Sequence, residues 1–148
     1  MVLFNQIIIG IPIAAFGYFT GIVKPDISSN LPSFQRVMLD LTIAILGQEI
    51  IFYYSHRLLH KSFFYKTIHK MHHEWKSPVG VTAVYAHPIE HIFSNIIPVV
   101  SGFVIMRSHY AVVLLFLTIV HITTITDHSG YHLPFFHSSQ CHDFHHLK

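Results

Sequence analysis

The sequence predicts an all-α integral membrane protein, a bundle of about four transmembrane or re-entrant helices with a cytosolic, histidine-rich helical cap. Hydrophobic residues make up 51% of the chain and the mean hydropathy is +0.47. Charged residues account for 11%, against about 25% in soluble domains. The apolar residues gather in four runs, whereas most of the 15 histidines stand in short groups between and after these runs.

The first two runs are long enough to be membrane helices. Val2–Val23 carries no charge and can cross a hydrocarbon core of ~30 Å at about 1.5 Å per residue. Lys24–Arg36, with prolines and small polar residues, predicts a loop. Val37–Tyr54 is apolar again but includes Asp40 and Glu49. We expect an N-terminal region, residues 1–47, that holds one membrane helix, the loop and the start of the second helix.

The third and fourth runs, Ile92–Met106 and Ala111–Ile125, predict a helical hairpin that either crosses the membrane or re-enters it. Positive charge near the ends of the runs assigns the sides of the membrane. The cations between the second and third runs place that segment in the cytosol: Arg57, Lys61, Lys66, Lys70 and Lys76. The N-terminus and all histidine groups would then share the cytosolic side.

Four histidine groups are the strongest functional signal: HRLLH, HKMHH, HSGYH and HDFHH. Their spacings of one, three or four place imidazoles on one helix face, and neutral imidazole is the commonest side-chain metal ligand. The candidate ligands are His56, His60, His69, His72, His73, His128, His132, His142, His145 and His146. They exceed the four ligands of a tetrahedral zinc site and fit two metals with about five nitrogens each.

Neutral ligands leave the metal charge uncompensated, so nearby carboxylates are expected to orient the rings. The candidates are Glu49, Glu74, Glu90, Asp127 and Asp143, with solvated loop carboxylates as the equal alternative. His87, and with it His91, fits an outer, hydrogen-bonded role. We expect the isolated histidines, His109, His121 and His137, to be ordinary satisfied polar groups. His121 lies inside an apolar run and could instead touch substrate.

Composition also limits the partners of the chain. The formal charge of +2 is too small to indicate nucleic-acid binding, and no basic run is interleaved with aromatic residues. Histidine-rich tracts can be incidental metal scavengers, but those tracts are usually contiguous. Here the groups extend from His56 to His146 and stand among aromatic residues, which favours a packed metal site.

In the order in which they occur, HRLLH, KTIHKMHHEW, YAHPIEH, HSGYHLP and HDFHHLK resemble the fatty acid hydroxylase/sterol desaturase superfamily. The resemblance is closest to its fatty acid hydroxylase domain-containing and C4-methylsterol oxidase-like members. It covers residues 48–148, which we expect to be a fatty acid hydroxylase-like domain. Members of the family continue past the last histidine group, so the chain is expected to be truncated at its C-terminus or to be a fragment.

The resemblance implies a multi-pass protein of the endoplasmic reticulum membrane with a non-haem di-iron centre held by the ten histidines. It also implies oxidation of a lipid C–H bond, on a sterol C4-methyl or a fatty acyl chain, in lipid or sterol biosynthesis. O2 would be the oxidant, and electrons would come through cytochrome b5 or an NAD(P)H-dependent reductase.

Side chains alone supply no oxidant strong enough for an unactivated C–H bond, so the chemistry needs a redox metal. Zinc cannot change its oxidation state, which favours iron even if purified material holds zinc. No catalytic residue beyond the metal ligands is predicted. Apolar side chains are expected to line the lipid path or to pack between helices: Phe52, Phe93, Ile97 and Phe103. The alternative function is a non-catalytic metal-binding membrane protein or a truncated regulatory isoform.

Overall fold

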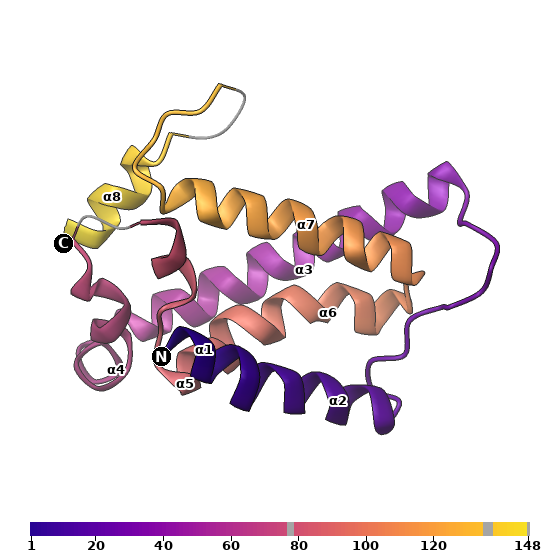
Figure 1. Cartoon of the computed structure of the whole chain (residues 1–148), viewed down its shortest axis with the longest axis horizontal. Helices are drawn as coiled ribbons and strands as arrows, with labels where there is room; N and C mark the ends of the chain where they lie inside the picture. The colour runs from indigo at the N-terminus through magenta and orange to yellow at the C-terminus, as the bar shows by residue number, and fades with distance from the viewer. Residues whose placement is uncertain (77–78, 135–137, 148) are drawn as a thin grey trace.

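In a computed structural model of the chain, helices form an elongated bundle with the histidine-bearing segments gathered at one end (Figure 1). The structure describes residues 1–76, 79–134 and 138–147, and within these ranges it contains helices and no strand. Four helices are long and apolar enough to cross a membrane: Val2–Phe19, Phe34–Leu59, Pro88–Met106 and Tyr110–Asp127. The predicted all-α membrane fold is therefore confirmed.

The first membrane helix is continuous and changes its hydrogen-bonding pattern along its length. It consists of α1 (Val2–Phe4), the π-helical η1 (Asn5–Gly10) and α2 (Ile11–Phe19). The apolar run continues to Val23, but the helix ends earlier because Gly21 has a φ of +74° and Val23 N–H turns back to the Gly17 carbonyl at 2.9 Å. Only glycine adopts this left-handed conformation at little cost.

The second membrane helix, α3 (Phe34–Leu59), is longer than the apolar run at both ends. The Ser33 side chain caps its first turn by accepting the Arg36 N–H at 3.3 Å. In its middle, α3 packs closely on the third membrane helix, where a Cβ added to Gly102 would lie 2.4 Å from Ala44 Cα. Small residues at such a crossing let membrane helices approach closely. The C-terminal turns of α3 carry His56 to the histidine end.

The third membrane helix is built from α5 (Pro88–Glu90), the π-helical η4 (His91–Ile96) and α6 (Ile97–Met106). A tight turn, in which Arg107 has a φ of 49°, leads to the fourth helix, α7 (Tyr110–Asp127). The two helices form the predicted hairpin. Phe103 and Phe116 meet edge to face at 5.0 Å, and with Ala44 they form the apolar core between α3, α6 and α7.

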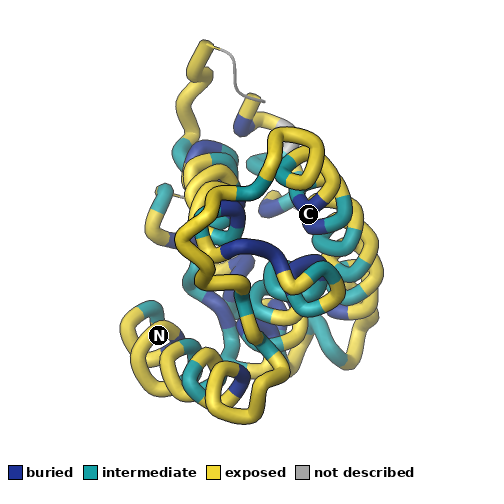
Figure 2. The backbone as a smooth tube through the Cα atoms, turned by 90° about the vertical axis from the view of Figure 1, so that its right-hand side faces the viewer, coloured by how far each residue is buried: buried dark blue, intermediate teal, exposed yellow. Residues whose placement is uncertain are grey.

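Short helices complete the histidine end: α4 (Ser62–Thr67), the 3-10 helices η2 (His69–Glu74) and η3 (Gly80–Val84), and α8 (Gln140–Leu147). They lie at the same end of the bundle as the N-terminus (Figure 1). The outward sides of the membrane helices are largely exposed, and buried stretches lie between the helices (Figure 2). Exposed apolar side chains such as Phe19 and Ile105 fit a lipid-facing surface.

Candidate metal centre

The structure brings eight of the predicted histidines into two groups at the histidine end of the bundle. The first cluster is His56, His60, His69 and His145, and the second cluster is His72, His128, His142 and His146. Within each cluster, one ring nitrogen from every member lies within 4.8 Å of the others. Segments far apart in the sequence therefore deliver nitrogen atoms to two small volumes.

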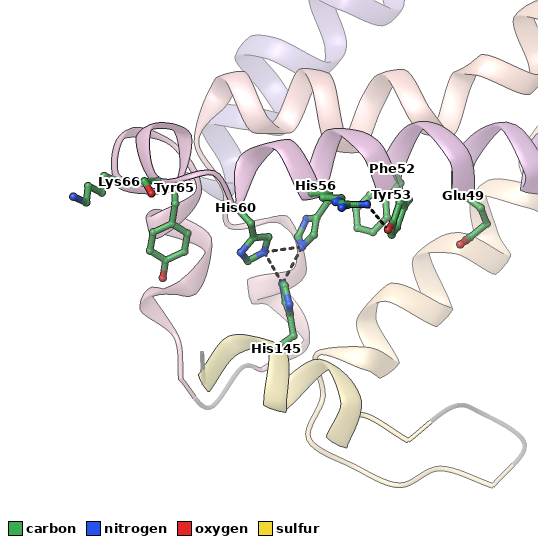
Figure 3. Close-up of a pocket in the computed structure, with 10 residues that line it drawn as sticks. Glu49, Phe52, Tyr53, His56, His60, Tyr65, Lys66 and His145 are labelled. Carbon is green, nitrogen blue, oxygen red and sulfur yellow. Dashed lines mark hydrogen bonds between the residues drawn. The ribbon is translucent and has the colours of Figure 1, made fainter.

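The first cluster forms where the end of α3 meets α8. His56 and His60 stand four residues apart at the end of α3, and His145 reaches them from α8 (Figure 3). The three Nε2 atoms form a triangle: His56 to His145 is 2.9 Å, His60 to His56 is 3.3 Å and His60 to His145 is 3.2 Å. His69 joins from η2, with its Nε2 3.2 Å from that of His60.

The second cluster forms where the end of α7 meets α8. His128 is the residue that ends α7, and its Nε2 lies 2.8 Å from that of His142. One turn later on α8, His146 places its Nε2 3.0 Å from that of His142. His72 comes from η2, and its ring centroid lies 4.7 Å from that of His146. Both clusters thus draw ligands from η2 and α8.

Two of the ten predicted ligands fall outside these groups of four. His73 lies between the clusters, because its Nε2 is 3.0 Å from that of His69 and its ring stacks on His146 at 4.7 Å. His132, in contrast, is exposed and its Nδ1 lies 3.0 Å from the Ser138 hydroxyl. The structure brings nine of the ten together, and a ligand role for His132 stays a prediction.

The spacing of the ring nitrogens fits metal coordination. Within the clusters, the closest Nε2 atoms are 2.8 to 3.3 Å apart. Metal–imidazole bonds of about 2.0–2.1 Å at right angles separate two ligand nitrogens by about 3 Å. A neutral imidazole has one N–H, so three Nε2 atoms that face one another cannot all be paired by hydrogen bonds. A shared cation would satisfy the lone pairs that converge there.

Oxygen acceptors fix the tautomers of three clustered rings. The Nδ1–H groups donate to the Glu90 carboxylate from His69 at 2.8 Å, to the Tyr85 carbonyl from His72 at 3.2 Å and to the Thr124 carbonyl from His128 at 2.8 Å. Each bond leaves the Nε2 lone pair of its ring directed into a cluster. Such outer partners set the orientation and basicity of metal ligands.

Burial keeps the clustered rings neutral, which is the form that binds metals. Removal from water lowers the pKa of His69, His145 and His146 to about 4, and neighbouring imidazoles add to the effect at the last two. Burial first, and nearby rings second, lower the pKa of His73 and His142 to about 3. Burial also lowers the pKa of His60, His72 and His128.

Of the predicted outer carboxylates, Glu90 is buried and contacts a ligand directly, through its bond to His69. Asp127 and Asp143 lie close enough to His128 to favour its charged form, which opposes the effect of burial on the pKa of His128. Glu49 is exposed and lines a cleft beside His56. Glu74 accepts a hydrogen bond from the Tyr85 hydroxyl at 3.2 Å.

The remaining histidines have other partners. His87 Nδ1 accepts the Ile89 N–H at 3.2 Å and so caps α5, and the outer role predicted for His87 stays a prediction. His91 is buried, with its Nδ1 3.4 Å from the Asn95 amide nitrogen. His121 donates to the Leu117 carbonyl at 2.6 Å. His137 lies outside the described residues.

A cleft of about 780 Å³ opens beside the first cluster along the exposed face of α3 (Figure 3). His56, His60 and His145 form part of its wall. The other lining residues are Glu49, Phe52, Tyr53, Arg57, Ser62, Tyr65 and Lys66. Of the apolar residues expected either to line a lipid path or to pack between helices, Phe52 lines this cleft. Phe103 takes the second role, because the hairpin packs it into the core against Phe116.

The sequence profile of the fatty acid hydroxylase family matches residues 41–148, a range that contains every member of both clusters. The chain belongs to this family. It is 48% identical over 148 residues to fatty acid hydroxylase domain-containing protein 2 of Homo sapiens, covering 99% of the chain and 44% of that protein.

Two further proteins are similar to this chain. A fatty acid hydroxylase of Mycosarcoma maydis is 42% identical over 79% of the chain and 30% of its own length. Methylsterol monooxygenase 2-2 of Arabidopsis thaliana is 32% identical over 80% of the chain and 47% of its own length. The chain thus spans less than half the length of each of these relatives. No solved structure matches it.

Proposed function

We propose that this chain forms the metal-binding membrane part of a non-haem di-iron oxidoreductase that hydroxylates or oxidises a lipid C–H bond with O2. The observation that carries the proposal is the pair of neutral imidazole clusters, which share η2 and α8 at one end of a membrane bundle. The family of the chain supports the reaction class, and the names of its relatives point to fatty acyl lipids and methylsterols as substrates.

The clustered histidines would hold two iron ions, with His73 between them as a ligand that either ion could take. Bound iron would supply the redox chemistry that side chains lack. In the overall reaction, one oxygen atom enters the C–H bond and the other leaves as water. That balance requires two electrons and two protons, for which we propose cytochrome b5 or an NAD(P)H-dependent reductase as the source of electrons.

The cleft would position the lipid. Phe52 and the ring of Tyr53 offer an apolar surface on α3, and the wall beyond them is formed by His56, His60 and His145. An alkyl chain or a sterol ring lying along this face would bring a carbon atom to the first cluster. Such positioning accounts for a large part of catalysis, because it removes the entropic cost of bringing the reactants together.

We further propose that the histidine end faces the cytosol from the endoplasmic reticulum membrane. The cations that predict this orientation, Arg57 and the lysines of residues 61–76, lie at the same end of the chain's bundle as both clusters. Glycan-acceptor sites introduced at the α6–α7 turn and at the N-terminus would test it. The turn should be glycosylated and the N-terminus should not.

A turnover assay tests the proposed activity. The iron-loaded protein, incubated with O2, a reductase and either a 4-methyl sterol or a fatty acyl lipid, should yield an oxygenated product. His72→Ala protein is the matched control and should yield none, because His72 belongs to the second cluster. Retention of two metals without turnover on either lipid class would favour the non-catalytic binding function instead.

A further inference from the structure

Asn5 is a fully buried amide near the start of the first membrane helix, with 0% of its surface exposed. Its side-chain nitrogen donates to the backbone carbonyl of Ala86 at 2.8 Å, a bond that joins residues 81 positions apart in the chain. A polar side chain in a membrane helix is costly unless it is paired, so this bond fixes the helix to the segment that contains Ala86.

Residues 85–90, which we call the orienting segment, carry two of the three acceptors that set the clustered rings. The Tyr85 carbonyl accepts from His72 of the second cluster, and the Glu90 carboxylate accepts from His69 of the first. Ala86, the partner of Asn5, directly follows Tyr85 and is itself 1% exposed. The amide of Asn5 is therefore one residue away from the carbonyl that orients a predicted metal ligand.

The surrounding packing agrees with this connection. The π-helical segment of the first membrane helix, η1, lies against the π-helical segment of the third, η4, and α1 lies against η3. Figure 1 shows the N-terminal helix beside α5, at the histidine end of the bundle. Asn5 opens η1, and π-helical turns are found frequently at functional sites.

We propose that Asn5 is a positioning residue of the metal centre, which acts through the orienting segment on His72. This inference rests on the proposed metal-binding function. Without the Asn5 N–H, the buried Ala86 carbonyl loses its partner, and the segment would shift to regain one. Such a shift moves the adjacent Tyr85 carbonyl, and with it the ring of His72. The same segment also carries Glu90, but four residues farther on, so we expect a smaller effect on the first cluster.

Cobalt(II) titration of metal-free protein in detergent tests this proposal through the affinity and visible spectrum of the bound ion. Asn5→Ala should bind the second-cluster ion about tenfold more weakly, at the lower end of the 10- to 100-fold effect of mutating outer-shell partners. Asn5→Leu, which keeps a similar size but has no hydrogen-bond donor, should show the same loss. Gln6→Ala is the matched control, since Gln6 is an exposed amide on the same helix.

Two backgrounds separate a positioning role from general destabilisation. In His60→Ala protein, where only the second cluster is complete, Asn5→Ala should produce the full loss and a changed cobalt spectrum. In His72→Ala protein, where only the first cluster is complete, Asn5→Ala should change affinity less than twofold.

Three results would overturn the inference: equal losses in the two backgrounds, an Asn5→Leu protein that binds like the unmodified chain, or a Gln6→Ala protein as weak as Asn5→Ala. If Asn5→Ala does not fold, the Asn5→Leu protein decides the matter in the same two backgrounds. Failure of the unmodified chain to bind cobalt at all would instead contradict the proposed function.

Discussion

A histidine stands at each end of α7, and the two use their ring nitrogens differently. His109 caps the start of the helix: its Nδ1 accepts the Ala111 N–H at 3.2 Å and its Nε2–H donates to the Ser28 carbonyl at 3.0 Å. At the other end, His128 donates from Nδ1 to the Thr124 carbonyl, but its Nε2 faces His142 Nε2 at 2.8 Å.

Both rings are buried, with 4% of each residue exposed, so burial does not distinguish them. The hydrogen-bond partners distinguish the two rings. Both ring nitrogens of His109 are paired with backbone groups. One ring nitrogen of His128 is paired with a backbone carbonyl, whereas the other faces the imidazoles of the second cluster. A histidine that binds metal is therefore recognised by a ring nitrogen that faces other ring nitrogens, and not by burial. The following predictions test that distinction.

The largest expected effect is on metal content. His128→Ala should remove the second-cluster ion, because the cluster loses one of its four rings, the one that the Thr124 carbonyl orients. His109→Ala should retain the same metal content as the unmodified chain. Elemental analysis after metal loading and desalting measures both. Equal metal contents in the two variants would contradict the assigned difference between the ends of α7.

The next effect is that of an outer partner. Glu90→Gln should weaken binding at the first cluster about 10- to 100-fold, because the buried carboxylate orients His69 through its Nδ1–H. Glu74→Gln is the matched control, since Glu74 is exposed and contacts the Tyr85 hydroxyl. Titration with a visible-absorbing metal ion compares the two affinities. An equal loss of metal affinity in Glu74→Gln would contradict the specific role of Glu90 in orienting His69.

A smaller, graded effect is expected from acid. Burial lowers the pKa of His69 and His145 to about 4 and that of His142 to about 3, so below pH 6.5 the unfolded chain binds protons that the folded chain does not. The stability of the metal-free protein should therefore be highest above pH 6.5 and fall as the pH drops towards 4. Each ring contributes at most about 1.4 kcal/mol per pH unit.

Thermal unfolding of the metal-free protein between pH 7.5 and pH 4.5 measures this decline. His142→Ala should show a shallower decline than the unmodified chain, since it lacks one of the rings held neutral by burial. Stability that is independent of pH in the unmodified chain would mean that the rings are not held neutral when folded.

The smallest effect concerns the structural histidine itself. His109→Ala removes a cap of α7 and the bond to Ser28, and should lower the free energy of unfolding by about 1–2 kcal/mol. Chemical denaturation in detergent measures the change. His121→Ala serves as the comparison, because His121 is exposed and its bond lies within its own helix, to Leu117. A larger loss in His121→Ala would reverse the expected order.

Much of the fold could be predicted from the sequence, because apolar runs between polar loops leave few alternatives in a membrane. The differences lie at helix ends, where local geometry decides. Gly21 ends the first helix before its apolar run is over, and the Ser33 cap starts α3 ahead of the second run. The hairpin was predictable, but the burial of Phe103 was not, since an apolar residue fits the core and the lipid equally well.

The histidine pattern predicted nine of the rings that gather, with His132 as the exception, but not how they divide between the clusters. η2 is a 3-10 helix, and it sends His69 to the first cluster and His72 to the second, a division that sequence spacing does not reveal. The carbonyls of Tyr85 and Thr124 could not be predicted as ring partners either, because every residue has a carbonyl. Asn5 and Gln6 stand side by side in an apolar run, a signal that the sequence analysis missed, but the sequence does not show which of the two amides is buried.

The most direct test of the central claim is the iron content of the unmodified chain, loaded with Fe²⁺ without oxygen and then desalted. The account predicts about two equivalents per chain, and about one in both His60→Ala and His72→Ala proteins, because each variant disables a different cluster. A single equivalent in the unmodified chain, or the loss of all iron in both variants, would contradict two separable sites built from facing imidazoles.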